Sequence, residues 1–241
     1  MRLPPLVPAL FQERLNRFAG RVLVEGSPVL VHIANSGRMK ELLQEGRTCW
    51  LVERHATKRK TAYDLALVDL GHTLASADAR LPSALVAEGV MEGGLEEFRG
   101  WRIRGREVPL GHSRLDLVLE QDGRLCWVEA KSVTLVERGV GLFPDAPTTR
   151  GQRHMESLAE AVRQGHRAAV VFVVQRSDAC AFAPNDLADP AFGEALRAAQ
   201  AQGVEVYAYR CRVGWEEVCL DAPLPVFSTL SQARTRWKRN E

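Results

Sequence analysis

The sequence predicts two domains, a small all-β domain followed by an α/β domain. Short β-like segments separated by turn residues fill the chain up to about residue 76, whereas strands and helices alternate after residue 81. Apolar residues make up 46% and charged residues 26% of the chain, which is typical of a soluble globular protein. We therefore place the domain boundary at residues 77–82.

The segments expected as strands in the first domain are Ala9–Leu15, Phe18–Val24, Val29–Ile33, Thr48–Glu53, Tyr63–Asp69 and His72–Ser76. Many short strands at close, regular spacing are typical of a small barrel or sandwich. In this half of the chain the pattern indicates a helix at Arg38–Leu43. The first domain is therefore expected to span residues 1–80.

The second domain, expected at residues 81–230, begins with a helix at Leu81–Glu88. Apolar residues at helical spacing predict a helix at 150–164, and the apolar run 168–175 is expected of a strand buried on both faces. Asp189 and Pro190 provide an N-cap and a first-turn proline for a helix that stops at Gly203, before a strand at 204–211. This order predicts an α/β layer with right-handed crossovers. Residues 231–241 are expected to form a basic tail, and its last eight residues are expected to fray.

Composition and sequence pattern also predict the cellular compartment of the protein. No apolar run approaches membrane-spanning length, and prolines at positions 4 and 5 interrupt the start of the chain before a signal-like core can develop. The five cysteines are scattered without Cys-x-x-Cys spacing, which indicates reduced thiols rather than disulfides or structural zinc. We therefore expect a cytoplasmic protein with no membrane partner. The sequence leaves a homodimer open.

A predicted β-hairpin brings acidic residues together. Asp122 and Gly123 are a preferred pair for the centre of a tight turn, because both must adopt positive φ. Counting outward from this turn places Asp116 opposite Glu129, with Lys131 on the same face. The register is supported by the apolar residues of the other face, which are Leu115, Leu117, Leu119, Cys126, Val128 and Ala130.

This predicted face has the composition of a metal site. Carboxylates directly across a strand pair lie about 5 Å apart at Cβ and repel each other by about 3 kcal/mol at an effective dielectric of about 20. Oxygen ligands from Asp116, Glu129 and the backbone carbonyl of Ala130 suit Mg²⁺ or Mn²⁺. Lys131 would orient or deprotonate a metal-bound water and stabilise charge on a phosphate. The alternative is a solvated strand face with an ion pair to Lys131 or Arg114.

Several blocks of the chain resemble the sugar fermentation stimulation protein A family. They are Ser113–Asp116, Val128–Leu135, Phe143–Gln152, Asn35–Met39, Thr57–Lys60 and Pro223–Val226, which together extend over nearly the whole chain. The block from Glu129 to Gln152 is the most specific. The resemblance implies an N-terminal OB-fold joined to an α/β domain of the PD-(D/E)xK, restriction-endonuclease-like type, with DNA as partner.

The resemblance also implies site residues. The catalytic pattern of such nucleases maps onto Asp116, Glu129 and Lys131. These domains tend to carry a glutamate on the preceding helix and a polar residue on the following one. Glu88, as a further metal ligand, and Gln152, as a further catalytic residue, are the candidates for these positions.

Basic residues suggest where nucleic acid binds. Arg54, Lys58, Arg59 and Lys60 lie in a predicted loop where an OB barrel commonly edges its groove, although a solvated loop has the same composition. Trp50 and Tyr63 flank this loop and are candidates for base stacking, with a core role expected for at least one of them.

The start of the helix at 150–164 carries a second basic group. Arg150 and Arg153 lie where helix amides and the helix dipole favour a phosphate. His154 is expected to be a surface or supporting residue rather than a catalytic base, because a metal ion and Lys131 already supply that chemistry.

The sequence therefore favours a DNA-binding protein that hydrolyses phosphodiesters with Mg²⁺ or Mn²⁺. The alternative is a non-catalytic DNA-binding or regulatory protein of sugar metabolism that retains a nuclease fold. The intact set of Asp116, Glu129 and Lys131 favours activity. An enzyme of small-molecule metabolism is disfavoured, because the sequence has no phosphate-binding glycine loop and no nucleophile elbow.

Overall fold

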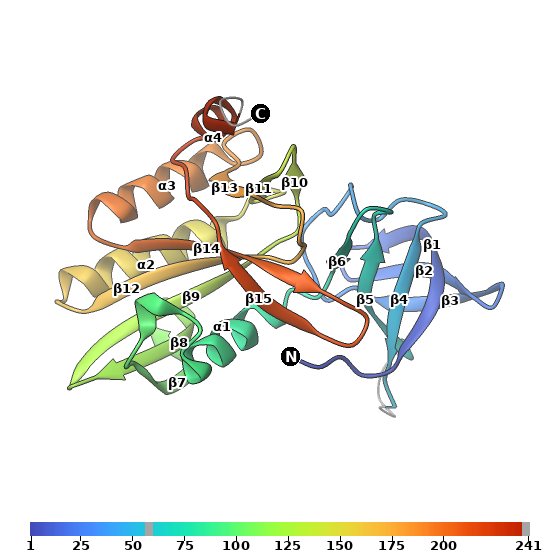
Figure 1. Ribbon diagram of the computed structural model, residues 1–241, viewed down its shortest axis with the longest axis horizontal. Coiled ribbons are helices and arrows are strands. Elements are labelled where there is room, and N and C mark those ends of the chain that lie inside the picture. The colour runs from blue at the N-terminus through green and yellow to red at the C-terminus, as the bar shows by residue number, and fades with distance from the viewer. Residues whose placement is uncertain (56–59, 238–241) are drawn as a thin grey trace.

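The computed structural model describes residues 1–55 and 60–237, which form a barrel and a larger α/β domain side by side (Figure 1). The strands of the barrel are β1 (Leu6–Asn16), β2 (Ala19–Val24), β3 (Ser27–His32), β4 (Thr48–Glu53), β5 (Tyr63–Asp69) and β6 (Leu74–Ser76). They follow the order β3-β2-β1-β4-β5-β6, and a parallel pairing of β3 with β5 closes the barrel. Buried apolar residues such as Phe11, Ile33 and Leu51 fill it. The predicted small barrel is confirmed.

The helix expected at Arg38–Leu43 is wrong. Met39 has a φ of 47°, which lies in the left-handed region and interrupts a right-handed helix. The N–H groups of Leu42 and Leu43 both donate to the carbonyl oxygen of Met39, so the segment forms turns. The N–H of Met39 donates to Asp145 of the other domain at 2.9 Å. The left-handed conformation of Met39 therefore occurs together with a contact to the other domain, and the local sequence pattern indicates neither.

The second domain is built on a sheet of order β15-β14-β12-β9-β8-β7, beside a small sheet of order β10-β11-β13. Its elements are α1 (Leu81–Glu92), η1 (Glu96–Phe98), β7 (Arg102–Leu110), β8 (Ser113–Gln121), β9 (Arg124–Val133), β10 (Val136–Glu137), β11 (Val140–Phe143), α2 (Thr149–Arg163), β12 (Arg167–Val174), β13 (Ala181–Pro184), α3 (Pro190–Ala201), β14 (Glu205–Val213), β15 (Val218–Pro223) and α4 (Leu230–Trp237). β12 runs parallel to both β9 and β14, as the strand and helix order predicts.

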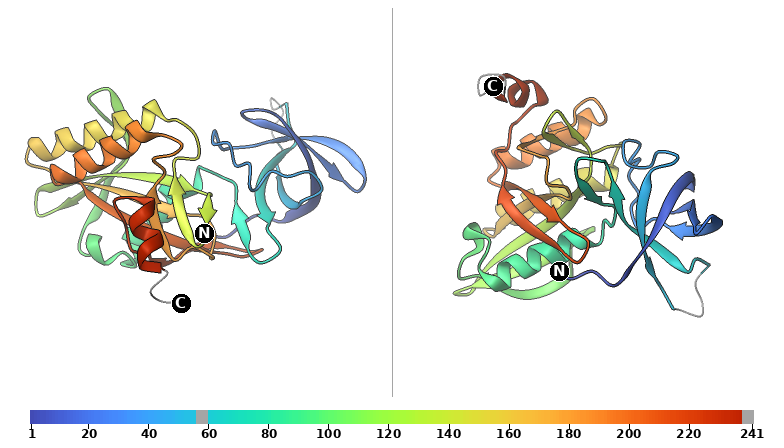
Figure 2. Two further views of the ribbon diagram at one scale, coloured as in Figure 1. Left: turned by 90° about the horizontal axis from the view of Figure 1, so that it is seen from above. Right: turned by 45° about the vertical axis from the view of Figure 1, so that its right-hand side comes forward.

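Helices cover both faces of the main sheet (Figure 2). α1 packs on the face that carries Leu117 and Val128, whereas α2 and α3 pack on the face that carries Val118 and Trp127. None of the described helices is long and apolar enough to cross a membrane. The α/β class expected of this half of the chain is confirmed.

In the basic tail expected at residues 231–241, the fraying expected of the last eight residues is wrong over the part that the structure describes. Leu230–Trp237 form α4, and Ala233 of this helix is 1% exposed. Ala233 packs with Val140, Leu142 and Ala183 of β11 and β13. An apolar side chain on one face of the segment therefore docks it on the domain. Residues 238–241 lie outside the described part of the chain.

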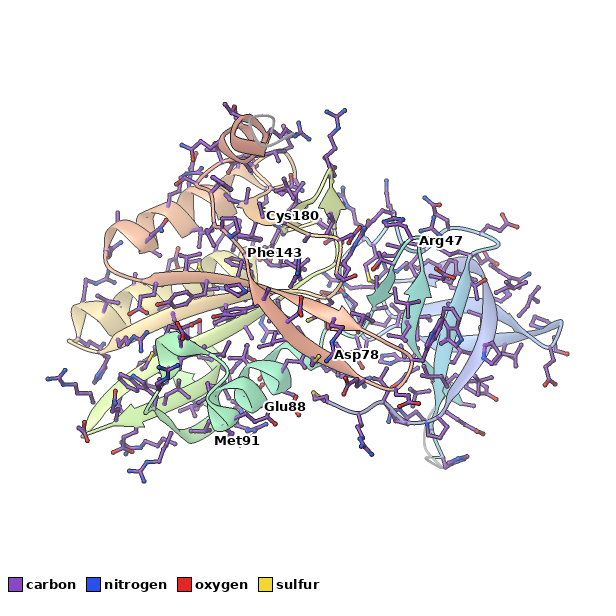
Figure 3. The ribbon with its side chains drawn as sticks, viewed as in Figure 1. Arg47, Asp78, Glu88, Met91, Phe143 and Cys180 are labelled. Atoms are coloured by element: carbon purple, nitrogen blue, oxygen red, sulfur yellow. The ribbon has the colours of Figure 1, made fainter. Side chains whose placement is uncertain are left out.

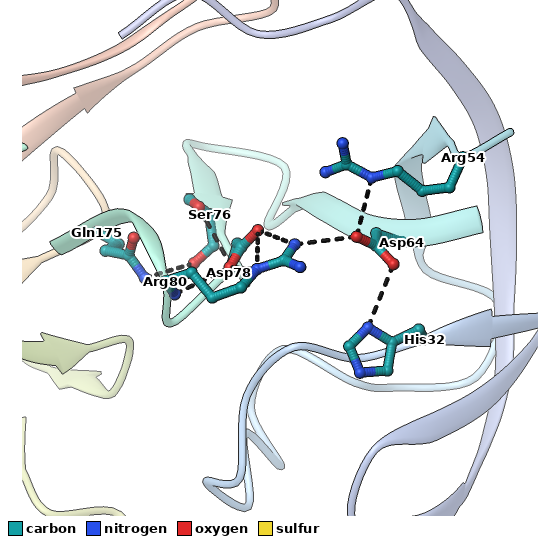
Figure 4. A network of polar contacts seen from close by, with 7 residues as sticks. All are labelled: His32, Arg54, Asp64, Ser76, Asp78, Arg80 and Gln175. Carbon is teal, nitrogen blue, oxygen red and sulfur yellow. Dashed lines mark hydrogen bonds and ion pairs between the residues drawn. The ribbon is translucent and has the colours of Figure 1, made fainter. Parts of the chain in front are cut away.

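Polar contacts fasten the two domains together. The N–H of Ser76, at the end of β6, donates to the carbonyl oxygen of Gln175 at 2.9 Å. Arg80, just before α1, donates to Asp78 beside it and to Asp64 of β5 (Figure 4). The connecting segment is therefore tied to both domains.

A second contact between the two domains joins a loop of the barrel to a loop of the α/β domain. Asp145, in the loop between β11 and α2, packs against Gly37 of the loop that follows β3. A Cβ atom at Gly37 would lie 2.6 Å from a carboxylate oxygen of Asp145, so a larger residue there would force this carboxylate to shift. The loop after β3 and the loop before α2 therefore form one continuous surface.

Candidate metal and nucleic-acid site

The hairpin of β8 and β9 has the predicted turn and register. Asp122 and Gly123 both adopt positive φ, of 50° and 77°. The ladder runs from Gln121 opposite Arg124 to Leu117 opposite Val128, as predicted. One residue further along, the carboxylate of Asp116 accepts a hydrogen bond from the N–H of Ala130 at 2.7 Å. The side chain of Asp116 is therefore fixed against β9 where the ladder ends.

Glu129 has one oxygen engaged and one oxygen free. Its side chain is buried, with only 4% of the residue exposed. Oε1 accepts a hydrogen bond from Nζ of Lys131 at 2.6 Å and lies 2.5 Å from Nδ1 of His154. Oε2 is also buried, yet it accepts no hydrogen bond from any residue in the described ranges. A buried carboxylate oxygen without a partner is costly, so this atom is suited to an additional cation.

His154 fixes the orientation of Glu129. Nε of Arg150 donates to Nε2 of His154 at 3.2 Å, so Nδ1 carries the proton that faces Glu129. His154 is buried, unlike the surface residue that the sequence allowed. The sequence did carry a signal, because His154 lies one helical turn before Leu158 on the apolar stripe of α2.

The two carboxylates differ in pKa. Burial, and after it the charge of Glu129, raise the pKa of Asp116 to about 7, against the opposing effects of the Ala130 N–H and Lys131. Burial also acts to raise the pKa of Glu129, but Lys131 and His154 outweigh it and hold that pKa below its usual value. Near neutral pH, Glu129 is therefore charged while Asp116 exchanges its proton. Bound positive charge would favour the ionised form of both groups.

The donor atoms fit a hard divalent cation. Asp116, Oε2 of Glu129 and the backbone of Ala130 offer oxygen ligands, and all three residues line one cleft. No group of three or more Asp, Glu, His or Cys side chains is arranged to hold a metal within residues 1–55 and 60–237. So small a donor set would leave further coordination positions of a divalent cation to waters and phosphate oxygens.

The cleft has walls from both domains and a volume of about 280 Å³. The wall from the second domain contains Asp116, Glu129, Lys131 and the loop before α2. The barrel contributes the opposite wall, which consists of Arg17, Asn35, Ser36 and Gly37. Sequence reasoning did not assign Arg17 to the site, and it used Asn35 to Gly37 only as part of a family resemblance.

The structure does not bring Glu88 to this cleft. Glu88 lies on α1 (Figure 3). Its carboxylate accepts a hydrogen bond from the amino group of Met1 at 2.9 Å. α1 packs on the sheet face opposite to the one where His154 meets Glu129, so Glu88 cannot reach the metal candidates. The assignment of Glu88 as a metal ligand is wrong.

Gln152 is also directed elsewhere. Its amide nitrogen donates to both carboxylate oxygens of Asp189 at 3.3 Å. Asp189 is the N-cap of α3 and accepts a hydrogen bond from the N–H of Phe192. Gln152 therefore joins two helices, while its helical neighbour His154 occupies the position beside Glu129. The expected catalytic role of Gln152 is wrong in this arrangement.

The residues expected to bind nucleic acid lie in different parts of the structure. Arg150 is exposed and lines the cleft, and Arg153 is exposed on the same first turn of α2. Arg54 donates to the buried Asp64 at 3.0 Å, which makes it part of the barrel (Figure 4). Lys60 is exposed.

The other residues expected to contact nucleic acid are Lys58, Arg59, Trp50 and Tyr63. Lys58 and Arg59 lie outside the described residues. Trp50 packs edge-on against Trp215 of the second domain, with ring centroids 4.0 Å apart. Tyr63 is partly buried against the barrel core. Neither Trp50 nor Tyr63 lines the cleft.

The fold and the site define a two-domain protein, in which a closed barrel is joined to an α/β domain that carries two carboxylates and a lysine at the end of its hairpin. Comparisons with known proteins specify it further. Residues 13–77 match the family model described as the SfsA N-terminal OB domain, and residues 80–217 match the sugar fermentation stimulation protein RE domain. The chain belongs to the sugar fermentation stimulation protein family.

Relatives align over most of their length. A sugar fermentation stimulation protein homolog from Moorella thermoacetica is 46% identical over 92% of this chain and 96% of its own. A homolog from Caldanaerobacter subterraneus is 44% identical over 87% and 92% of the two chains. The structure of Pyrococcus furiosus SfsA in complex with Ca²⁺ has a TM-score of 0.88 and 32% identity, covering 94% of this chain and 98% of that one.

Proposed function

We propose that the protein is a nuclease that uses Mg²⁺ or Mn²⁺ to hydrolyse phosphodiester bonds, with DNA as its preferred partner and the cytoplasm as its compartment. The observation that carries this proposal is the buried Oε2 of Glu129, which has no hydrogen-bond partner among the described residues and lies beside Asp116 and Lys131. The Ca²⁺ complex of the Pyrococcus relative supports a divalent cation. Asp116, Glu129 and the backbone of Ala130 would hold the metal ion.

The residues of the cleft have separable roles in this chemistry. When bound, the metal ion would polarise the scissile phosphate and offset the negative charge that develops on it. Lys131 places a positive charge at the same point, and its contact with Glu129 keeps Nζ in place. Arg150 lines the cleft at the first turn of α2, where a cation and free amide groups favour a neighbouring phosphate. Arg153, Arg54 and Lys60 would bind the nucleic-acid backbone outside the cleft.

Calorimetric titration with Mn²⁺ and a cleavage assay on linear, circular and single-stranded DNA and on RNA test the proposal. We expect Asp116→Asn and Glu129→Gln to weaken Mn²⁺ binding and to reduce cleavage by about 100-fold or more. Glu88→Gln is the matched control, because it removes an acidic charge outside the cleft. It should bind and cleave like the unaltered protein.

Absence of Mn²⁺-dependent cleavage on every substrate would contradict the nuclease. Cleavage that is undiminished in Asp116→Asn would contradict the assigned site. Mn²⁺ binding that is lost in Glu129→Gln, in a protein that cleaves nothing, would instead favour a DNA-binding protein that keeps the metal site as a scaffold.

A further inference from the structure

The barrel wall of the cleft makes the site narrow. Arg17, Asn35 and Ser36 face the same space as Glu129 and Lys131. The volume of about 280 Å³ lies near the lower end of pockets for single small ligands, about 300–1,000 Å³. Such a volume suits about one nucleotide unit, which favours a strand without its pairing partner.

The barrel wall is also held in place. The guanidinium group of Arg14 donates to the carbonyl oxygens of Gly37 at 2.5 Å, Asn35 at 3.0 Å and Arg17 at 2.6 Å. One side chain therefore joins the turn after β1 to the loop after β3. That loop is fastened to the second domain by the hydrogen bond from Met39 to Asp145. Opening the cleft for a duplex would break this contact.

An exposed aromatic ring lies beside Arg17, which is a residue of the cleft wall. Phe18 follows Arg17 in the turn between β1 and β2 and is 47% exposed. The guanidinium carbon of Arg17 lies 5.9 Å from the centroid of the Phe18 ring. An exposed aromatic beside a cation is the combination with which proteins bind unpaired strands, since a base can stack on the ring while the cation meets the backbone. Bases inside a duplex are not available for such stacking.

We propose that the cleft takes a single unpaired strand, either a single-stranded nucleic acid or the overhang of a duplex. Phe18 stacks on a base, and Arg17 binds the phosphate that leads the strand towards Lys131. This assignment of substrate class rests on the proposed nuclease function. It makes the barrel the part of the protein that rejects intact duplex.

Fluorescence anisotropy in EDTA tests the proposal without turnover. The probes are oligothymidylate, oligouridylate, a blunt duplex of matched length and the same duplex with an overhang. We expect the single strands and the overhang to bind about tenfold tighter than the blunt duplex, with DNA and RNA separated by the first two probes. Phe18→Ala should weaken single-strand binding by about tenfold. The matched control Leu30→Ala removes an apolar side chain of the barrel that is 46% exposed, and it should change nothing.

Arg17→Ala adds an independent readout. It should weaken binding of every single strand and lower the dependence of log affinity on log salt by about one unit, as loss of one phosphate contact requires. The proposal is overturned if the blunt duplex binds as tightly as oligothymidylate, if Phe18→Ala and Leu30→Ala lose equal affinity, or if Arg17→Ala leaves the salt dependence unchanged. A strand preference without cleavage in Mn²⁺ would overturn only the nuclease. Equal cleavage of blunt duplex and single strand would overturn only the strand preference.

Discussion

The barrel and the second domain each bury acidic residues, but they balance the charge differently. In the barrel, Asp64 is 1% exposed and is surrounded by positive groups (Figure 4). It accepts hydrogen bonds from Arg54 at 3.0 Å and Arg80 at 2.9 Å, and it contacts His32 at 3.2 Å. Such a cluster satisfies a buried carboxylate within the protein itself.

The cluster in the second domain is not balanced in this way. Asp116 and Glu129 face Lys131, and Oε2 of Glu129 has no hydrogen-bond partner in the described part of the chain. Asp116 accordingly has its pKa raised to about 7, by burial and then by Glu129. Comparison of the two regions shows that burial of an acidic residue does not by itself mark a functional site. The local shortage of positive charge is what distinguishes the cluster in the cleft from the cluster in the barrel.

The largest expected effect concerns the balanced cluster. The double variant Arg54→Met/Arg80→Met should lower the free energy of unfolding by about 3–5 kcal/mol, because it leaves the buried Asp64 without both of its arginine partners. Urea denaturation measures this. Glu13→Gln, which removes a partner of Arg21 on the surface of the same barrel, should cost less than about 1 kcal/mol. Equal losses in the two variants would remove the distinction between the barrel cluster and an ordinary surface pair.

The next effect concerns catalysis at the unbalanced cluster. Lys131→Met should reduce cleavage by about 100- to 1,000-fold, as loss of one electrostatic contact in the transition state does. Mn²⁺ affinity should not fall, because the cation that competes for Glu129 has been removed. Cleavage rates and calorimetric titration separate the two quantities. If the cleavage rate and the Mn²⁺ affinity both fell, Lys131 would instead stabilise the structure of the site.

A smaller effect depends on pH. The pKa of Asp116 in the folded protein is raised to about 7, so the folded state binds this proton more tightly than the unfolded chain does. Its contribution to stability is present below the unfolded pKa and is lost as the pH rises from about 4 to 7. In EDTA, Asp116→Asn should therefore be more stable than the unaltered protein by about 1–3 kcal/mol at pH 8, and similar at pH 4. Urea denaturation at both values measures the difference. A difference that does not change with pH would contradict the raised pKa.

The smallest effect is expected at Glu88. Glu88→Gln removes a partly exposed ion pair with the amino group of Met1, which contributes less than about 1 kcal/mol. Thermal unfolding of the metal-free protein should therefore change little, and added Mn²⁺ should raise the melting temperature as much as in the unaltered protein. A smaller rise of the melting temperature in this variant would indicate that Glu88 does contribute to metal binding.

Turn chemistry made part of the site predictable from sequence. The Asp122-Gly123 turn fixes the register of β8 and β9, and a fixed register decides which side chains share a face. Asp116, Glu129 and Lys131 could therefore be brought together by counting residues from the turn. The family resemblance identified the same residues and both domains.

The parts of the site that depend on packing between elements could not be predicted in this way. α1 carries apolar residues on most of its surface, so its sequence does not show that Glu88 lies on the wrong side of the sheet. Gln152 and His154 are two positions apart on α2, and only the docked helix shows which of them meets Glu129. No periodic pattern connects Arg17 with a strand more than a hundred residues later.

The contact between Gly37 and Asp145 has a consequence for how the family can change over evolutionary time. Any side chain at position 37 would collide with the carboxylate at position 145, and loss of that carboxylate would leave the N–H of Met39 without its acceptor. Substitutions at these positions, which lie in different domains, should therefore occur together across related sequences. Exchange of one barrel for another by recombination should succeed only when the matching loop before α2 is exchanged with it.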